Sequence, residues 1–436
     1  MDETFKVFHR VLSIAGIPIY AKRNWDSKGW LLLQILNFIL GFLTFLFTSG
    51  FVASNVSNLL LFIQGACIWT TGVIMFITLG VCLYFKRDFR AFLEEIAFSD
   101  LILEMPLIEH IVNLSLAPGK LGELKTMVLD SQERLLKYTR ILFISYVASV
   151  WLCASLYLCT PIYLMCVTGD ENLRLLAFDM WFPWGLENFA VYVASFIFHA
   201  YAGYLCCIAY PGLQSTIFFM VGQIVRQLRI ICFIMLNLDE LAGEIVDGNL
   251  EFRQTVCTQI LSQCVAHYVK IKRFANRLNV ICQPFYLALL LVAVMLVCMC
   301  SVKIAISDKL SMDTAKYYVH EFCFILVVLL FCSLGQQVQN ECEKLEVAVV
   351  EKWYIFNAKH RNSVRIFHMA LSQRMPIYIF GSVTLSLPTF TWVSRPYAKY
   401  SHTGLLYSFT PNRVIITVWA AKLTARRLDA SNRSKE

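Results

Sequence analysis

The chain has 436 residues, of which 58% are hydrophobic and only 16% are charged. Water-soluble domains carry about 25% charged residues, so this composition excludes an ordinary soluble protein and indicates one whose solvent is lipid. The formal net charge of +8 does not indicate a nucleic-acid partner. The basic residues lie in the loops that flank apolar segments, as is usual in membrane proteins.

Seven apolar segments are long enough to cross a bilayer, which needs about 20 residues of helix. Only helices and closed barrels satisfy the backbone in lipid, so we expect an all-α polytopic membrane protein with seven transmembrane helices. The predicted segments are residues 30–51, 58–85, 141–167, 189–221, 280–306, 319–338 and 364–394. Since proline breaks helical hydrogen bonding, we expect the seventh helix to be split near Pro376.

Lys and Arg alternate between the two sides of these segments. Five precede the first segment, and eight, seven and five follow the second, fourth and sixth. None follows the first segment, one follows the third, and three lie from Lys303, at the end of the fifth segment, to the start of the sixth. The positive-inside rule therefore predicts a cytoplasmic N-terminus and an external C-terminus. This orientation is opposite to that of G-protein-coupled receptors. The chain also lacks the DRY-like triplet after the third segment and the NPxxY motif in the seventh segment that are typical of that class.

The same pattern divides the chain into parts. We expect a cytoplasmic N-terminal segment at 1–29, and spans one to four at 30–222 with an external aromatic loop at 168–188. A cytoplasmic helical stretch at 223–279 is a candidate anchor region. Spans five to seven follow at 280–395 with a cytoplasmic elbow at 339–363, and a basic tail occupies 396–436.

The sequence offers no pattern for catalysis. The 16 cysteines form no CxxC pair and no zinc spacing with histidine, so we expect no metal and no cofactor. Four ionisable residues, Glu187, His199, His320 and Glu321, lie near the predicted membrane interfaces, where solvated side chains are usual. An enzyme is therefore not expected.

The stretch 331–390 carries the most informative pattern. It contains, in order, Cys332, Gly335, Cys342, Glu343, Leu345, Trp353-Tyr354, Arg374-Met375-Pro376, Gly381, Leu385-Ser386-Leu387 and Thr389-Phe390. In order and spacing these residues resemble the C-terminal signature of insect odorant receptors. Two other places resemble that family, the loop around Trp181 and Pro183 and the Cys264-x-x-His267 sequence. The motif residues that we single out are Trp181, Pro183, His267, Gly335, Trp353, Pro376, Gly381, Ser386 and Phe390.

The resemblance implies a ligand-gated, nonselective cation channel subunit in the plasma membrane of a sensory neuron dendrite. It implies a heterotetramer with an odorant co-receptor, a small volatile odorant as ligand, and no requirement for a G protein. The short stretch between the fourth and fifth spans is similar to that of ligand-tuning subunits, because the co-receptor carries a longer one there.

Aromatic and hydroxyl side chains occur in the predicted external halves of spans two, three, four and six. Such walls suit small apolar molecules, although aromatic residues at helical spacing are more often plain packing. The candidate ligand-binding residues are Trp69, Thr70, Ser155, Tyr157, Tyr192, Phe196, Tyr318 and Phe322. The sequon Asn55-Val56-Ser57 lies in the first external loop, so Asn55 is a candidate glycosylation site.

The resemblance implies that the second half of the seventh helix lines the pore. The candidate pore or gate residues are Thr389, Val393, Leu405 and Leu406. The family pattern ends at Pro396, and the tail beyond it is unusually basic for an external segment. Two explanations stay open for this tail: a genuine extracellular tail, or a wrongly translated gene model.

Two other classes also stay open. The related gustatory receptors carry a Thr-Tyr and Gln-Phe pattern in their seventh helix, where this chain has Thr389-Phe390. A transporter would show interrupted helices in repeat-related pairs and charges at membrane depth, and this sequence shows one interrupted span and no inverted repeat.

Overall fold

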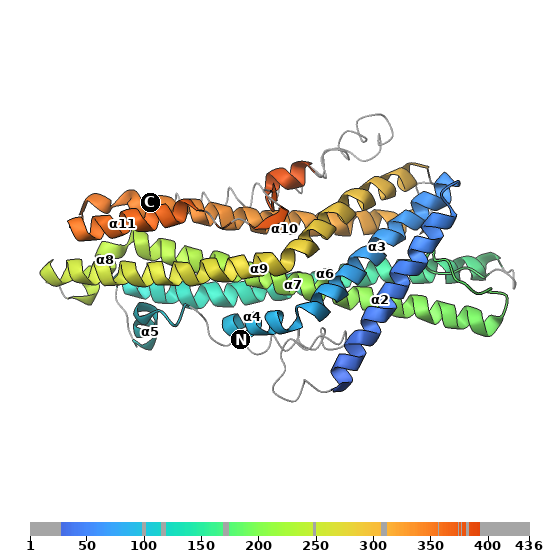
Figure 1. Ribbon diagram of the computed structural model, residues 1–436, viewed down its shortest axis with the longest axis horizontal. Helices are drawn as coiled ribbons and strands as arrows, with labels where there is room; N and C mark the ends of the chain where they lie inside the picture. Colours follow the sequence, from blue (N-terminus) through green and yellow to red (C-terminus); the bar gives the residue numbers. More distant parts are fainter. Residues whose placement is uncertain are drawn as a thin grey trace.

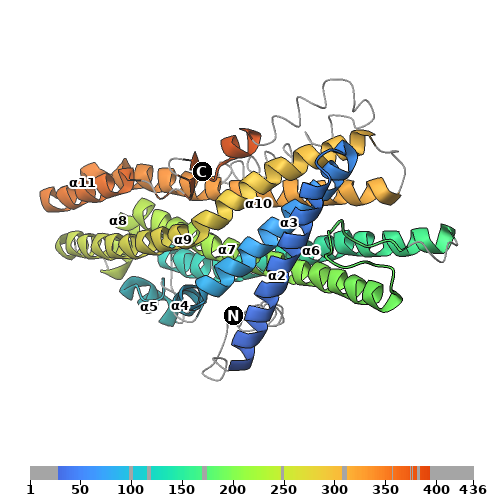
Figure 2. The same ribbon diagram turned by 45° about the vertical axis from the view of Figure 1, so that its right-hand side comes forward.

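The computed structural model is an elongated bundle of long helices (Figure 1). It describes residues 28–97, 102–114, 119–168, 174–246, 250–306, 312–355, 357–373, 375, 377–380 and 383–392. Helices α6, α7, α9 and α10 run along the length of the bundle, whereas α2 and α3 cross one half of it, as Figures 1 and 2 both show. The predicted positions of the two termini lie outside the described residues.

Within the described residues, six helices are long and apolar enough to cross a membrane. They coincide with the first six predicted segments, and the predicted all-α polytopic membrane fold is confirmed. These helices are α2 (Lys28–Ser54), α3 (Leu59–Tyr84), α6 (Gly119–Thr168), α7 (Phe189–Leu236), α9 (Leu250–Ile306) and α10 (Met312–Glu351).

Four of these helices are much longer than a bilayer is thick. Helices α6, α7, α9 and α10 have 50, 48, 57 and 40 residues, or about 60–85 Å at 1.5 Å per residue. A hydrocarbon core is about 30 Å thick, so each helix must extend well beyond it. The stretch predicted as a helical region at 223–279 is the end of α7, the short α8 (Leu238–Ile245) and the first half of α9.

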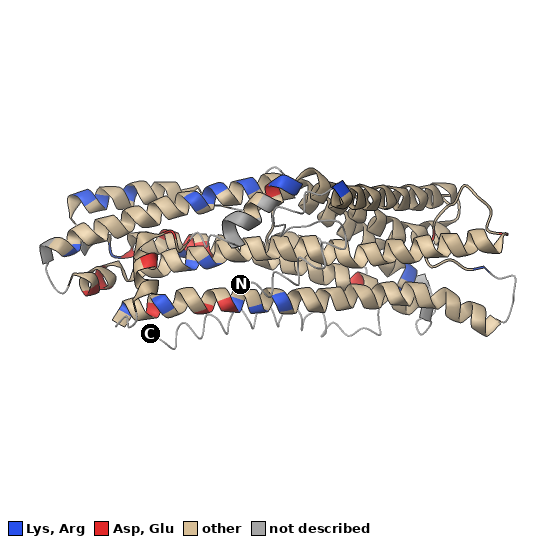
Figure 3. Ribbon diagram, turned by 90° about the horizontal axis from the view of Figure 1, so that it is seen from below, with Lys and Arg blue, Asp and Glu red and all other residues tan. Residues whose placement is uncertain are grey.

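Charged residues are unevenly distributed along the bundle. Figure 3 shows Lys, Arg, Asp and Glu gathered along one half of the bundle, while few are coloured in the other half. The charge-poor half contains α2, α3 and residues 141–168, 189–221, 280–306 and 312–338. The charge-rich half contains the remainder of the long helices together with α4 (Lys86–Ala97), α5 (Pro106–Asn113), α8 and α11 (Ala358–Ser372).

Asparagine side chains cap three helices. The side-chain oxygens of Asn58, Asn188 and Asn357 accept hydrogen bonds from the first-turn N–H groups of α3, α7 and α11. Such caps satisfy backbone donors that have no partner within the helix. The helices therefore begin where the sequence supplies a short polar acceptor.

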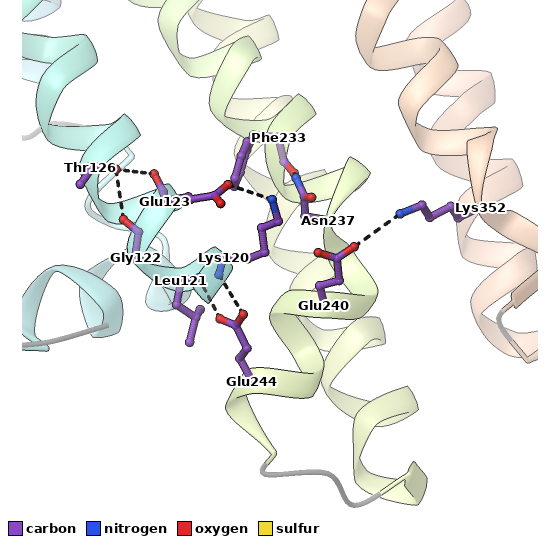
Figure 4. A network of polar contacts seen from close by, with 10 residues as sticks. All are labelled: Lys120, Leu121, Gly122, Glu123, Thr126, Phe233, Asn237, Glu240, Glu244 and Lys352. Carbon is purple, nitrogen blue, oxygen red and sulfur yellow. Dashed lines mark hydrogen bonds and ion pairs between the residues drawn. The ribbon is translucent and has the colours of Figure 1, made fainter. Parts of the chain in front are cut away.

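A carboxylate from α8 caps the start of α6 in the charge-rich half (Figure 4). Glu244 accepts hydrogen bonds from the backbone N–H of Lys120 at 2.8 Å and of Leu121 at 2.9 Å. One turn earlier on α8, Glu240 lies 3.9 Å from the Nζ of Lys352, just after α10. Helix α8 thus links α6 to the end of α10.

The seventh predicted segment is divided, but not by a simple kink. Helix α11 ends at Ser372, and the chain then forms an antiparallel hairpin of β1 (Tyr378–Phe380) and β2 (Val383–Thr384) before a helical stretch at 387–392. The backbone N–H of Leu385 donates to the carbonyl of Ile377 at 2.8 Å, which closes the hairpin. The expected split is present, and the hairpin that separates the two helical stretches was not predicted. Pro376 itself lies outside the described residues.

Candidate functional site

A cavity lies in the charge-poor half between α3, α6, α7 and α10. The centre of a water molecule can move through about 80 Å³ of it, whereas one water needs about 10–15 Å³ on the same measure. There is therefore room for a small organic molecule. The lining residues are mostly apolar: Thr44, Ile68, Thr71, Gly72, Met75, Tyr146, Val150, Cys153, Ala154, Tyr157, Phe178, Met180, Ala202, Gly203, Cys206, Tyr210, His320, Cys323 and Phe324.

Helical periodicity brings the α6 wall together. Tyr146, Val150, Cys153, Ala154 and Tyr157 follow one another at intervals of one, three or four residues, so they share one face of α6. On α10 the same rule aligns His320 with Cys323 and Phe324. Both faces are apolar enough to have faced lipid, and only the packing of the bundle decides that they face the cavity.

The loop at 174–188, predicted to be external, covers part of the cavity. The backbone N–H of Phe178 donates to Nδ1 of His199 on α7 at 3.1 Å, and the Phe178 ring lies 5.7 Å from the Tyr157 ring. The backbone N–H of Trp181 donates to the carbonyl of Phe47 on α2 at 3.0 Å. Hydrogen bonds to α7 and α2 and a ring contact with α6 therefore hold this loop over the site.

Three polar side chains on the cavity wall lie within hydrogen-bonding distance of one another in a chain. Thr71 Oγ1 on α3 lies 3.1 Å from Nε2 of His320 on α10. Nδ1 of the same ring lies 3.3 Å from the hydroxyl of Tyr157 on α6. All three residues line the cavity, and Tyr157 and His320 are buried. This chain joins three helices at one point of the wall.

Charged side chains lie immediately behind this wall. Lys316 Nζ is 5.1 Å from the centre of the Tyr157 ring, and Lys303 Nζ donates to Gln64 at 3.0 Å. Glu321 accepts a hydrogen bond from Ser301 at 2.9 Å. The sequence pattern indicates a solvated interface for His320 and Glu321, but the structure buries both side chains between helices.

Of the eight predicted ligand-binding residues, Tyr157 lines the cavity. Thr70 is buried one position from Thr71 and donates to the carbonyl of Cys67 at 2.7 Å. Phe322 is 58% exposed, one position from Cys323. A step of one residue turns a helix by about 100°, which is enough to leave the lining. The other five, Trp69, Ser155, Tyr192, Phe196 and Tyr318, also lie outside it.

Two of those five residues, Trp69 and Tyr192, make hydrogen bonds that stabilise local packing. The indole N–H of Trp69 donates to Ser49 on α2 at 2.8 Å. The Tyr192 hydroxyl donates to the carbonyl of Leu175 at 2.9 Å and so connects the 174–188 loop to α7. Ligand contact by these residues stays a prediction.

The lining residues Thr71, Phe178 and His320 were not among the predicted ligand-binding residues. The spacing of His320, Cys323 and Phe324 could have indicated that they share one helix face. Hydropathy could not tell that this face meets α3 and α6, because lipid and a protein interior are equally apolar.

Helix α10 connects the cavity to the segment with the candidate pore residue. Gly335 packs against the backbone of Leu385, and Gln339 donates to Thr384 at 3.3 Å. Beyond these contacts, Thr389 Oγ1 donates to the Thr384 carbonyl at 2.7 Å, and Ser386 lies within hydrogen-bonding distance of Thr389. Val393, Leu405, Leu406 and the motif residues Pro376 and Gly381 lie outside the described residues.

The other predicted residues are dispersed. Pro183, Trp181 and Trp353 are exposed, whereas His267 is buried on α9 and Phe390 is half-buried. Asn55 lies in the turn between α2 and α3, where its side-chain amide donates to the carbonyl of Phe51 at 2.8 Å. Its glycosylation stays a prediction. Among the residues that the structure describes, no group of His, Cys, Asp and Glu could hold a metal ion.

Membrane-crossing helices around an internal apolar cavity define a polytopic membrane protein. A model of the seven-transmembrane odorant receptor family matches residues 120–395, more than half of the chain. The chain belongs to the insect odorant receptor family, a family of receptors rather than enzymes. It is 21% identical over 376 residues to Odorant receptor 13a of Drosophila melanogaster, with 82% of this chain and 83% of that protein covered.

The fold is similar to that of the olfactory receptor OR5 from Machilis hrabei. The TM-score is 0.74 at 14% identity, both for the complex of that receptor with eugenol and for the receptor alone. The alignments cover 91% of this chain and 95% of the eugenol-bound chain, or 92% and 97% for the receptor alone. At this identity the likeness shows that the two chains share a fold.

Proposed function

We propose that this chain is the ligand-tuning subunit of an odorant-gated cation channel. The observation that carries the proposal is the apolar cavity between α3, α6, α7 and α10 in the charge-poor half. An odorant in this cavity gains free energy mainly from burial of apolar surface, at about 25 cal/mol per Å². Such binding tolerates many ligands of suitable shape and has modest affinity.

Gating follows if the ligand binds the open state more tightly than the closed state. The cavity residue His320 and the contact residue Gly335 belong to the same helix, α10. They are 15 positions apart, or about 22 Å along the helix axis. A ligand that shifts or rotates α10 therefore acts directly on Leu385 and on the helical stretch at 387–392 that carries Thr389.

The proposed partner is an odorant co-receptor, with which this chain forms a heterotetramer around a shared pore. Large apolar side chains exposed in the charge-rich half support an assembly surface there. Val347 on α10 is 63% exposed, and Ile366 and Met369 on α11 are 58% and 63% exposed. Outside the membrane such a group is best covered by another protein chain. The proposed location is the plasma membrane of a sensory neuron dendrite, and no G protein is required.

Whole-cell recording tests the proposal. Cells express this chain, an insect odorant co-receptor, or both, and volatile odorants are applied while surface expression of each protein is measured. Rapid inward cation current that requires both proteins and differs from that of the co-receptor alone is the expected result. Current from this chain alone would favour the gustatory-type alternative. Absence of an odorant-dependent current with both proteins at the surface would overturn the proposal.

A further inference from the structure

The hydrogen-bonded chain Thr71–His320–Tyr157 has one more donor than it has bonds. A neutral imidazole carries one N–H, and each hydroxyl carries one O–H, so the three side chains offer three protons. The two contacts of the chain, at 3.1 and 3.3 Å, use two of them. Either tautomer of His320 therefore leaves one hydroxyl proton without a partner inside the chain.

The two hydroxyls differ in what else they can reach. If Tyr157 donates to His320, the spare proton belongs to Thr71. A helical threonine can donate to the carbonyl four residues earlier, which for Thr71 is that of Cys67. If Thr71 donates to His320, the ring donates to Tyr157 and the phenol proton is spare. A tyrosine hydroxyl is too far from its own helix backbone to donate to a carbonyl there, so this second arrangement leaves a spare donor at the cavity wall, where Tyr157 is a lining residue.

A nearby positive charge strengthens the phenol as a donor. Lys316 Nζ lies 5.1 Å from the centre of the Tyr157 ring. A cation over an aromatic face is attracted by its electrons, and it draws electron density away from the ring and its hydroxyl. An O–H group polarised in this way binds an uncharged acceptor more strongly. Because an unsatisfied donor in an apolar site costs free energy, a ligand that supplies an acceptor gains affinity.

We propose that the cavity selects small neutral molecules with an apolar body and one hydrogen-bond acceptor oxygen, such as ketones, aldehydes and esters. The Tyr157 hydroxyl donates to that oxygen, and His320, which contacts the Tyr157 hydroxyl directly, orients it. This inference rests on the proposed function of the cavity and adds the chemical class of its ligand.

Matched pairs of volatile molecules test the inference in cells that express this chain with the co-receptor. Acetophenone and α-methylstyrene have nearly the same shape, but only acetophenone has a carbonyl oxygen. We expect acetophenone to activate at the lower concentration. A hydrogen bond of ordinary net strength predicts that Tyr157→Phe raises its half-maximal concentration by roughly five- to tenfold. The response to α-methylstyrene should keep its half-maximal concentration.

Two further variants locate the donor. Thr71→Val leaves the Tyr157 hydroxyl in place, so it should keep the preference for acetophenone. Tyr204→Phe removes a hydroxyl from the exposed face of α7 and should leave both responses unchanged.

The possible results have distinct meanings. Equal sensitivity to both molecules, an equal effect of Tyr157→Phe on both, or loss of the preference in Thr71→Val alone would each overturn the inference while the cavity still binds odorants. Absence of any evoked current with both members of every pair would overturn the proposed function, and the inference with it.

Discussion

Gly335 of α10 lies directly against the backbone of Leu385. A Cβ built on Gly335 would overlap the Leu385 carbonyl oxygen and come within 2.9 Å of its carbonyl carbon and 2.8 Å of its Cβ. Real Cβ atoms do not approach other heavy atoms this closely, and backbone atoms cannot rotate away as a side chain can. The absence of a side chain at residue 335 therefore allows α10 to contact the segment that follows the β1–β2 hairpin.

Gly335→Ala should uncouple the two elements. Overpacking costs about 1–3 kcal/mol, and we expect the variant to lose most odorant-evoked current at equal surface expression. Gly80→Ala on α3 is the matched control, because a Cβ there would meet Phe38 at an ordinary 3.5 Å. Whole-cell recording with a surface label gives both quantities, and a Gly335→Ala variant with normal current would contradict the coupling route.

The cap that Glu244 places on α6 should contribute measurably to stability. Glu244→Ala removes the acceptor of two backbone N–H groups, so we expect the free energy of unfolding to fall by about 1–2 kcal/mol. Thermal unfolding of the detergent-solubilised protein measures this change. Glu123→Ala removes an exposed carboxylate that pairs with the Lys120 side chain at 2.9 Å, and exposed pairs of this kind contribute little. Equal effects of the two substitutions would rule out the cap as the cause.

His360 on α11 should make the charge-rich half sensitive to acid. Burial lowers the pKa of His360 below its ordinary value of 6.5. As pH falls through about 6.5 the unfolded chain takes up a proton that the folded chain does not, so the folded state loses stability. The contribution of His360 is fully present above that pH and is lost as pH falls toward the folded-state pKa.

His360→Gln should therefore flatten the decline in unfolding free energy between about pH 7.5 and 5. Denaturant unfolding at a series of pH values measures the slope. His110 on α5 is exposed, so His110→Gln serves as the control and should retain the wild-type slope. A slope unchanged by His360→Gln would show that other groups cause the acid sensitivity.

Hydropathy located the membrane helices well but could not show which face of each helix packs against its neighbours. The predicted span at 58–85 differs from α3 by one residue at each end. A bilayer requires an apolar stretch of a certain length, and such a stretch can be recognised in a single sequence. The burial of His320 and Glu321 was missed, because it depends on which neighbouring helices cover that face of α10. The β1–β2 hairpin was also missed, since Tyr378 and Ile379 suit an apolar helix as well as a strand.

The long extensions of α6, α7, α9 and α10 were only partly anticipated. The mixture of charged and apolar residues at 223–279 predicted helices, and the described part of this stretch is helical; its place outside the membrane stays a prediction. Helices α7 and α9 each continue without a break from an apolar stretch into a charged one. The sequence did not predict this continuity, because hydropathy changes at such a boundary whether or not the helix ends there.

Filling the cavity tests the central claim most directly. Ala154→Phe adds a ring at the α6 wall, whereas Ala148→Phe adds the same ring at an exposed position of the same helix. Odorant-evoked current is measured for both variants with the co-receptor, at matched surface expression. The account predicts that Ala154→Phe abolishes or strongly reduces the response and that Ala148→Phe retains it. A full odorant response in Ala154→Phe, over the same concentration range as the unmodified chain, would contradict binding in this cavity.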